Sequence, residues 1–162
     1  MSLDARAFPE IVEPRHLDAL RAIGTEKRFA DGDWLWQAGE RDYPCHFVEA
    51  GTIEILEEAC AIDGDAPTLV ASHGPGHFSG DVDLLAGRPA VIGGRAKGET
   101  VTIEILPDAL RDLVRLDGEL GAILLDAMLA RREILMGETG HGIRLFGSAF
   151  DPETLRAREF LT

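Results

Sequence analysis

The sequence has 162 residues and a mass of 17.6 kDa, a size at which roughly 69% of the unfolded chain's surface is buried on folding. One well-filled core is therefore expected, and two full domains are not. The 29 acidic residues outnumber the 16 basic ones, giving a formal charge of −13, which repels phosphate backbones and anionic lipids and argues against a nucleic-acid partner. No run of about 18 apolar residues occurs, so the sequence predicts no transmembrane helix, no signal peptide and no membrane partner, and it favours a cytoplasmic protein.

The first predicted element is a short helix that begins near Pro14 and ends at Gly24. Leu17, Leu20 and Ile23 recur at helical spacing between these two residues. Proline is favoured in the first turn of a helix and glycine just after its last turn.

Residues 27–106 change to a period of two, which is typical of β-strands. Pairs that favour turns interrupt this pattern at six places: Asp31-Gly32, Ala38-Gly39, Ala50-Gly51, Asp63-Gly64, Gly74-Pro75-Gly76 and Gly93-Gly94. Seven or eight strands at such regular spacing predict a mainly β fold with flanking helices, an antiparallel jelly roll or double-stranded β-helix. Trp34 and Trp36 would share one face of a strand and anchor the core.

The helical period returns after Pro107 and predicts a pair of helices, at about residues 108–115 and 117–137. The middle of the second helix is apolar around most of its circumference, with Asp126 the only charge between Gly121 and Ala130. The β-core can cover only one side of such a helix. We therefore expect a partner subunit, in a homodimer formed through residues 117–137, or an attached domain to cover the other side.

Two motifs resemble the cyclic nucleotide-binding domain of catabolite-activator-type regulators and of the regulatory subunit of cAMP-dependent kinase. The first runs from Phe29-x-x-Gly32-Asp33 through Gly39-Glu40 to Ile53-Glu54-Ile55. The second, Gly76-x-Phe78-x-Gly80-Asp81-x-x-Leu84-Leu85-x-Gly87, resembles the phosphate-binding cassette of that family. The resemblance covers about residues 15–137 and implies a regulatory domain over residues 1–140.

The resemblance also implies a ligand site, in which a glycine and the first turn of a short helix present backbone N–H groups to the cyclic phosphate. The ligand-binding residues expected from it are Phe78, Gly80, Asp81, Val82, Leu84, Leu85, Arg88, Ala90 and Val91. Asp81 stands where the family has a glutamate that binds the ribose, and Ala90 stands where the family has an arginine that pairs with the phosphate. Arg88 points to the same side of an extended chain as Ala90 and is the candidate substitute, the alternative being an arginine in a solvated turn.

Residues 141–162 are expected to be a linker and the truncated start of a following domain. Residues 143–148 and 151–161 resemble the first strand, loop and helix of a thioredoxin-like unit. This join resembles bacterial proteins in which such a regulatory domain precedes a thioredoxin-reductase-like flavoprotein, which implies a redox-related parent protein carrying FAD. The loop Ser148-Ala149-Phe150-Asp151 contains no cysteine and could not itself exchange disulfides.

The remaining candidate sites favour a chain that is not itself an enzyme. Cys45 and Cys60 form no disulfide framework and are expected to be reduced thiols. His73 and His77 have a metal-like spacing, but the intervening Gly-Pro-Gly excludes a helix that would align them, so no metal site is expected. The predicted function is a non-catalytic sensor domain with weak or altered binding of cAMP or cGMP and no cofactor of its own. The alternative is a degenerate roll that binds no nucleotide and serves as a dimerisation or docking module.

Overall fold

The structure is a computed structural model that describes residues 5–57 and 66–138. Its elements, in chain order, are η1 (Ala5–Ala7), α1 (Pro14–Ile23), β1 (Thr25–Phe29), β2 (Trp34–Trp36), β3 (Cys45–Glu57), β4 (Thr68–His73), α2 (Val82–Leu85), β5 (Gly93–Ile105), α3 (Pro107–Leu116) and α4 (Gly118–Glu138). The chain divides into two compact units, residues 1–132 and 133–162. The first unit contains the whole sheet and most of α4.

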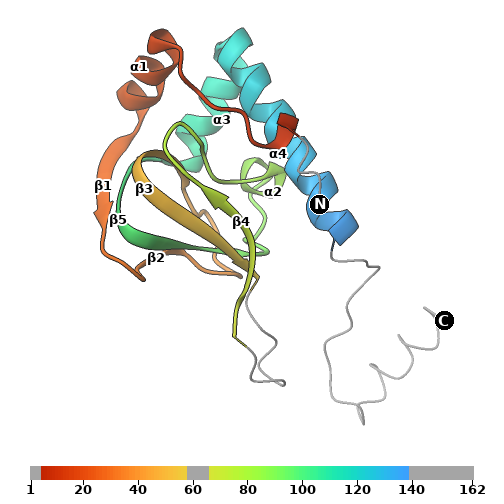
Figure 1. The fold of residues 1–162 in the computed structure, drawn as a ribbon. Coiled ribbons are helices and arrows are strands. Elements are labelled where there is room, and N and C mark those ends of the chain that lie inside the picture. The colour runs from red at the N-terminus through yellow and green to blue at the C-terminus, as the bar shows by residue number, and fades with distance from the viewer. Residues whose placement is uncertain (1–4, 58–65, 139–162) are drawn as a thin grey trace, which may run out of the picture. The chain divides into compact units, whose positions relative to one another are not determined.

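The strands form one antiparallel sheet with the order β1-β5-β3-β4, and β2 also pairs with β5 (Figure 1). The sheet curls into a roll, with the helices α1, α3 and α4 gathered at one end of it and α2 between the roll and α4. The predicted antiparallel β-roll with flanking helices is therefore confirmed. The leading helix and the C-terminal helix pair also occur within a few residues of their predicted bounds.

The expected number of strands is wrong for the described residues, which contain five strands instead of seven or eight. The difference arises because β3 and β5 are each 13 residues long, and each includes residues at which a turn was expected. Ala50-Gly51, expected to be a turn, is a bulge within β3, where the register with β5 shifts. Gly51 has a φ of +81° and lies against the backbone of Glu99 and Thr100, so only glycine fits this bulge.

Gly93-Gly94 is also not a turn, because both residues belong to β5. The indole ring of Trp36 lies directly on Gly94, where a Cβ atom would overlap the ring. Trp36 is 3% exposed and donates its indole N–H to the carbonyl of Ile92 at 2.8 Å. The turns at Asp31-Gly32, Ala38-Gly39 and Pro75-Gly76 are present, whereas Asp63-Gly64 lies outside the described residues.

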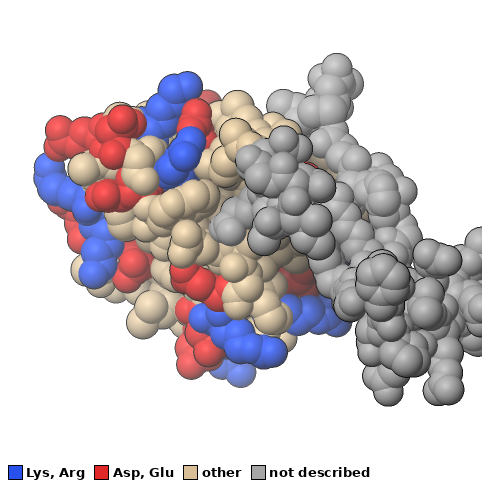
Figure 2. Space-filling view, turned by 90° about the horizontal axis from the view of Figure 1, so that it is seen from below, with Lys and Arg blue, Asp and Glu red and all other residues tan. Residues whose placement is uncertain are grey.

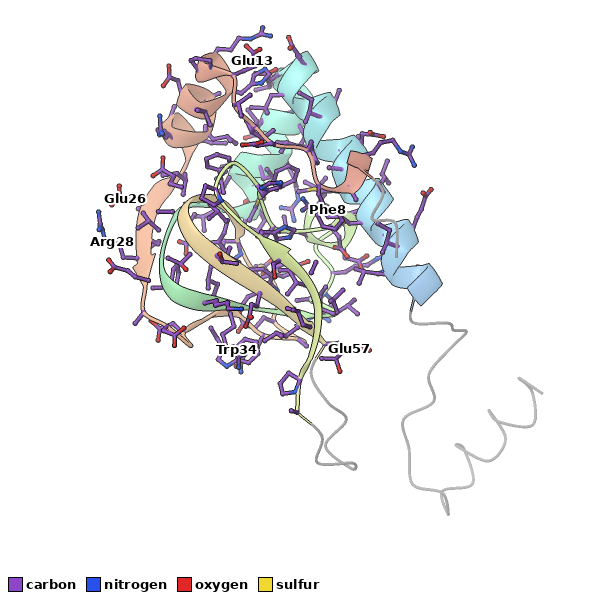
Figure 3. The ribbon with its side chains drawn as sticks, in the orientation of Figure 1. Phe8, Glu13, Glu26, Arg28, Trp34 and Glu57 are labelled. Atoms are coloured by element: carbon purple, nitrogen blue, oxygen red, sulfur yellow. The ribbon has the colours of Figure 1, made fainter. Side chains whose placement is uncertain are left out.

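The two tryptophans do not share a buried face, contrary to expectation. The register of β2 shifts between Trp34 and Trp36. Trp34 is only partly buried at the rim of the roll, where the Arg95 guanidinium lies 5.7 Å from its ring centre (Figure 3). Trp36 alone is a core anchor.

Helix α4 packs on the roll through a buried stripe formed by Leu120, Leu124, Ala127 and Met128. Leu129 on the other side is 46% exposed. That a partner subunit or an attached domain covers this side of α4 stays a prediction. No helix in the described ranges has the length and apolar character needed to cross a bilayer.

Candidate functional site

The predicted cassette follows the turn at Pro75-Gly76 and lies beside β3. Phe78 bridges to Phe47, and the backbone N–H of Ser79 donates to the carbonyl of His46 at 2.9 Å. In return, the N–H of His46 donates to the Ser79 hydroxyl at 2.9 Å. These bonds fix the backbone at the entry to the cassette.

Gly80 allows the chain to turn from this extended segment into α2. Its φ is +100°, and a Cβ atom there would lie 3.2 Å from Leu84 Cδ1. Glycine is therefore required both for the backbone conformation and for the close packing of the first turn. Phe78 and Leu84 are fully buried, whereas Val82 and Leu85 are partly exposed.

Asp81 is the N-cap of α2, and its Oδ1 accepts a hydrogen bond from the N–H of Asp83 at 2.9 Å. Burial, followed by the charges of Asp81 and Asp83, raises the pKa of the nearby Tyr43 hydroxyl. Burial, followed by the neighbouring Asp83 charge, raises the pKa of Asp81. The carboxyl expected to meet a ribose is therefore engaged by the chain's own backbone.

Asp83 is a buried carboxylate that two arginines contact. Its side chain is 4% exposed, with Oδ2 at 2.7 Å from Arg132 Nη1 and Oδ1 at 3.3 Å from Arg88 Nη1. Arg132 belongs to α4 and Arg88 to the loop after α2. The candidate substitute for the missing phosphate-binding arginine thus pairs with Asp83, with 68% of its side chain exposed.

Arg131, the neighbour of Arg132 on α4, connects three separate segments. Its Nε donates to the carbonyl of Ala7 at 2.6 Å and its Nη1 to the carbonyl of Gly80 at 2.9 Å. The guanidinium lies 4.3 Å from the ring centre of Phe78. Burial lowers the pKa of Arg131 to about 10, which still leaves it charged at neutral pH.

Ala90 and Val91 lie beyond these contacts. The N–H of Ala90 donates to the carbonyl of Glu40 at 2.8 Å, and its own carbonyl accepts from the N–H of Gly39 at 2.7 Å. Ala90 is buried among apolar residues, while Val91 is 51% exposed. The structure thus brings the residues from Phe78 to Arg88 together and leaves Val91 at the surface.

Asp83 lies in the cassette, and Tyr43, Arg131 and Arg132 lie near it, but the sequence analysis did not name these four residues. A signal for the two arginines exists, because they are adjacent charges that end an almost uncharged helical stretch. Arg131 follows Ala127 by four residues and Met128 by three, so it continues the buried stripe of α4. Nothing in the local sequence marks Tyr43.

The other candidate groups form no reactive arrangement in the described ranges. The Cys45 thiol contacts the carbonyl of Ser79 at 3.1 Å, and burial raises its pKa to about 12. This thiol is accordingly protonated and inert at neutral pH. No set of three metal-ligating side chains occurs among the described residues.

A groove of about 260 Å³ lies elsewhere on the roll, and none of the predicted ligand residues lines it. Its walls come from the segment before α1, from α1, from β3 and from the turn before the cassette: Ile11, Val12, Leu17, Arg21, Phe47, Val48, Glu49 and Gly76.

Comparison with known proteins gives matches in structure only. No family model and no curated protein matches the sequence. The catabolite activator protein of Thermus thermophilus superposes with a TM-score of 0.65 at 19% identity, over 79% of this chain and 58% of that chain. The c-di-GMP responsive global regulator CLP of Xanthomonas campestris gives 0.63 at 18% identity, over 92% of this chain and 71% of that one.

A third similar structure is a mutant regulatory subunit of a cAMP-independent protein kinase A from Trypanosoma brucei, bound to cAMP in its A site. It superposes with a TM-score of 0.54 at 16% identity, over 93% of this chain and 46% of that chain. The chain spans less than two thirds of several such structures, 58%, 63% and 66% of their lengths. The roll, the cassette segment and the helix pair together give this chain the cyclic nucleotide-binding fold of catabolite-activator-like proteins.

Proposed function

We propose that this chain is a non-catalytic regulatory domain, with weak or altered binding of cyclic nucleotides. The carrying observation is that α4 holds the cassette directly, through Arg131 on the Gly80 carbonyl and Arg132 on Asp83. A ligand that changed the cassette would change the packing of α4, and α4 would pass that change to an attached domain.

Weak binding is expected from the charges at the site. Ala90 offers no positive charge, and the carboxyls of Asp81 and Asp83 are both buried within the cassette. Losing one partner of a charged, hydrogen-bonded pair costs about 2 to 5 kcal/mol, which would weaken a micromolar site to roughly millimolar. The net charge of −13 opposes an anion further.

Calorimetric titration with cAMP and cGMP tests this proposal, with 5′-AMP as the control ligand. We expect dissociation constants well above the micromolar range and a preference for the cyclic compounds. Sub-micromolar affinity would contradict the weak site. Arg88→Ala should remove most of any binding if Arg88 substitutes for the missing arginine, and Arg115→Ala, an exposed arginine on α3, is the matched control.

A second candidate function is a dimerisation or docking module that binds no nucleotide. The observations that favour it are the internal partners of the cassette arginines and the 46% exposure of Leu129 on α4. A titration with no heat up to millimolar nucleotide, together with a stable dimer, would support this function over the first.

The redox-related parent protein remains a proposal drawn from residues 141–162, which lie outside the described residues. We expect the natural full-length protein to continue into a thioredoxin-reductase-like flavoprotein. Flavin absorbance of that full-length protein after purification tests this expectation. A colourless full-length protein would contradict it.

A further inference from the structure

Asp83 is an acidic residue buried within the cassette, and its carboxylate contacts two arginine side chains. Its side chain is only 4% exposed, yet both carboxylate oxygens have an arginine partner. A buried carboxylate is costly unless it is paired and hydrogen-bonded. The fold thus supplies Asp83 with the partners that an anion needs at this place.

The two arginines contribute unequally. Arg132 reaches Asp83 across 49 positions of sequence, at 2.7 Å and with a side chain that is 30% exposed. The distance is that of a strong, charge-assisted hydrogen bond. Arg88 lies five positions away, at 3.3 Å, and is 68% exposed. The bond with Arg132 is the one that joins the cassette to α4.

Asp81 satisfies one of the backbone donors at the start of α2. Its carboxyl accepts the N–H of Asp83, a donor that the first turn of α2 would otherwise leave free. Arg88 and Arg132 each place one nitrogen on the Asp83 carboxylate. An external anion that paired with Arg132 would therefore compete with Asp83.

We infer that Asp83 is a built-in anion that takes the place of a ligand and holds α4 on the cassette when nothing is bound. The domain then keeps α4 docked by default, and an anionic ligand acts by competing with Asp83 for Arg132. This inference rests on the proposed coupling between the cassette and α4, and it names the bond between Asp83 and Arg132 as the contact through which a ligand would act.

Hydrogen exchange of the α4 amides in Asp83→Ala tests the inference without any nucleotide. We expect the protection of residues 120–132 to fall about tenfold or more, because a buried charge-assisted bond is lost. Formate, a carboxylate small enough to enter the space left by the side chain, should restore protection in the variant and leave the wild type unchanged. Sodium chloride at the same ionic strength is the salt control.

Asp112→Ala is the matched control variant, because Asp112 is an exposed acid paired with an arginine one turn away. It should leave the protection of α4 unchanged. Protection that stays unchanged in Asp83→Ala, or that falls and does not respond to formate, would overturn the inference. Should Asp83→Ala fail to fold, Arg132→Gln tests the same bond at a more exposed position, and undiminished protection there would overturn it too.

The result is independent of the calorimetric test of function. Wild-type protein that binds no cyclic nucleotide would contradict the first proposed function, while the exchange and formate experiments would still decide the role of Asp83. Conversely, measurable cAMP binding with no effect of Asp83→Ala on α4 would leave the sensor function standing and refute the built-in anion.

Discussion

At the scale of single residues, Gly94 shows how one missing side chain shapes the roll. The Trp36 ring occupies the space where a Cβ atom of residue 94 would lie. Gly94 does not lie in a turn, although it follows another glycine, because both residues belong to β5. A close approach of an aromatic ring to a strand is therefore the reason for glycine at this position.

Gly94→Ala should destabilise the protein by about 2 to 4 kcal/mol, because the added methyl group forces the Trp36 ring out of its packed position. Urea unfolding followed by circular dichroism measures this loss. Gly118→Ala is the control, since a Cβ atom at residue 118 would meet no atom within 4 Å. Equal stability of the two variants would show that Trp36 does not depend on Gly94.

The buried His46 predicts a dependence of stability on pH. Burial, with a smaller contribution from Lys27, lowers the pKa of His46 from 6.5 to about 4. Between these two values the unfolded chain binds a proton at His46 and the folded chain does not. The His46 contribution to folding stability is therefore fully present above about pH 6.5 and falls as the pH drops toward 4. The loss from His46 is about 3 kcal/mol.

The pKa of His73 is lowered by burial as well, which acts in the same direction. The raised pKa of Asp81 has the opposite effect on the stability of the protein. The folded chain holds the Asp81 proton more tightly than the unfolded chain does, so stability falls as the pH rises from the unfolded-chain pKa to the folded-chain pKa. Urea unfolding at several pH values between 7 and 4.5 measures the sum. His46→Gln should flatten the curve, and an equally steep curve in that variant would contradict the assignment.

At the scale of elements, α4 has two distinct faces. One holds the roll and the cassette through its apolar stripe and the two arginines, Arg131 and Arg132. The other presents Leu129 to solvent. Leu124, in the middle of this helix, is 1% exposed and belongs to the core of its own chain. Leu124→Glu would therefore damage the fold and is not a test of assembly.

Leu129→Glu is the substitution that tests a homodimer formed through α4. We expect the wild-type chain to be dimeric at tens of micromolar, because a paired helix would cover the exposed apolar side. The variant should be monomeric and keep its circular dichroism spectrum, since Leu129 is outside the core. Light scattering that gives a 17.6 kDa particle for the wild type would reject the dimer.

At the scale of the whole molecule, acidic residues outnumber basic ones by 13. On the face seen in Figure 2, acidic and basic side chains are interspersed over the described residues, with one group of basic side chains at the lower edge. The formal charge of −13 gives no electrostatic attraction to phosphate backbones.

We therefore expect no saturable binding of duplex DNA by this chain at physiological salt. Fluorescence anisotropy of a labelled duplex measures it, with the same duplex and a basic DNA-binding protein as the positive control. Binding in the micromolar range that weakens steeply with salt would contradict this prediction and show a local basic surface that the total charge conceals.

The sequence predicts the architecture well because the relevant signals are local. Alternation over residues 27–106 gives the roll, and the proline and glycine around α1 give its bounds. The motif around Gly80 located the cassette through its resemblance to a known family, and the positive φ of Gly80 agrees with the glycine in that motif. Each of these features depends on residues that are close together in the sequence, so the pattern can be recognised without knowing the fold.

The sequence does not predict contacts that depend on where distant elements meet. The bond between Asp83 and Arg132 requires the position of α4 relative to α2, and the contact between Trp36 and Gly94 requires the register of β2 on β5. The length of β3 was missed for the same reason, because a glycine in a bulge and a glycine in a turn look alike in sequence.

The hydrogen bond from Arg131 to the carbonyl of Ala7 has a consequence for synthesis of the chain. It joins positions 124 residues apart, so at usual rates of translation the N-terminal segment waits on the order of ten seconds for its partner to be made. The long loop between them must close first, which delays a contact of this kind during folding. This bond at the start of the domain therefore forms only after all the strands of the roll have been synthesised.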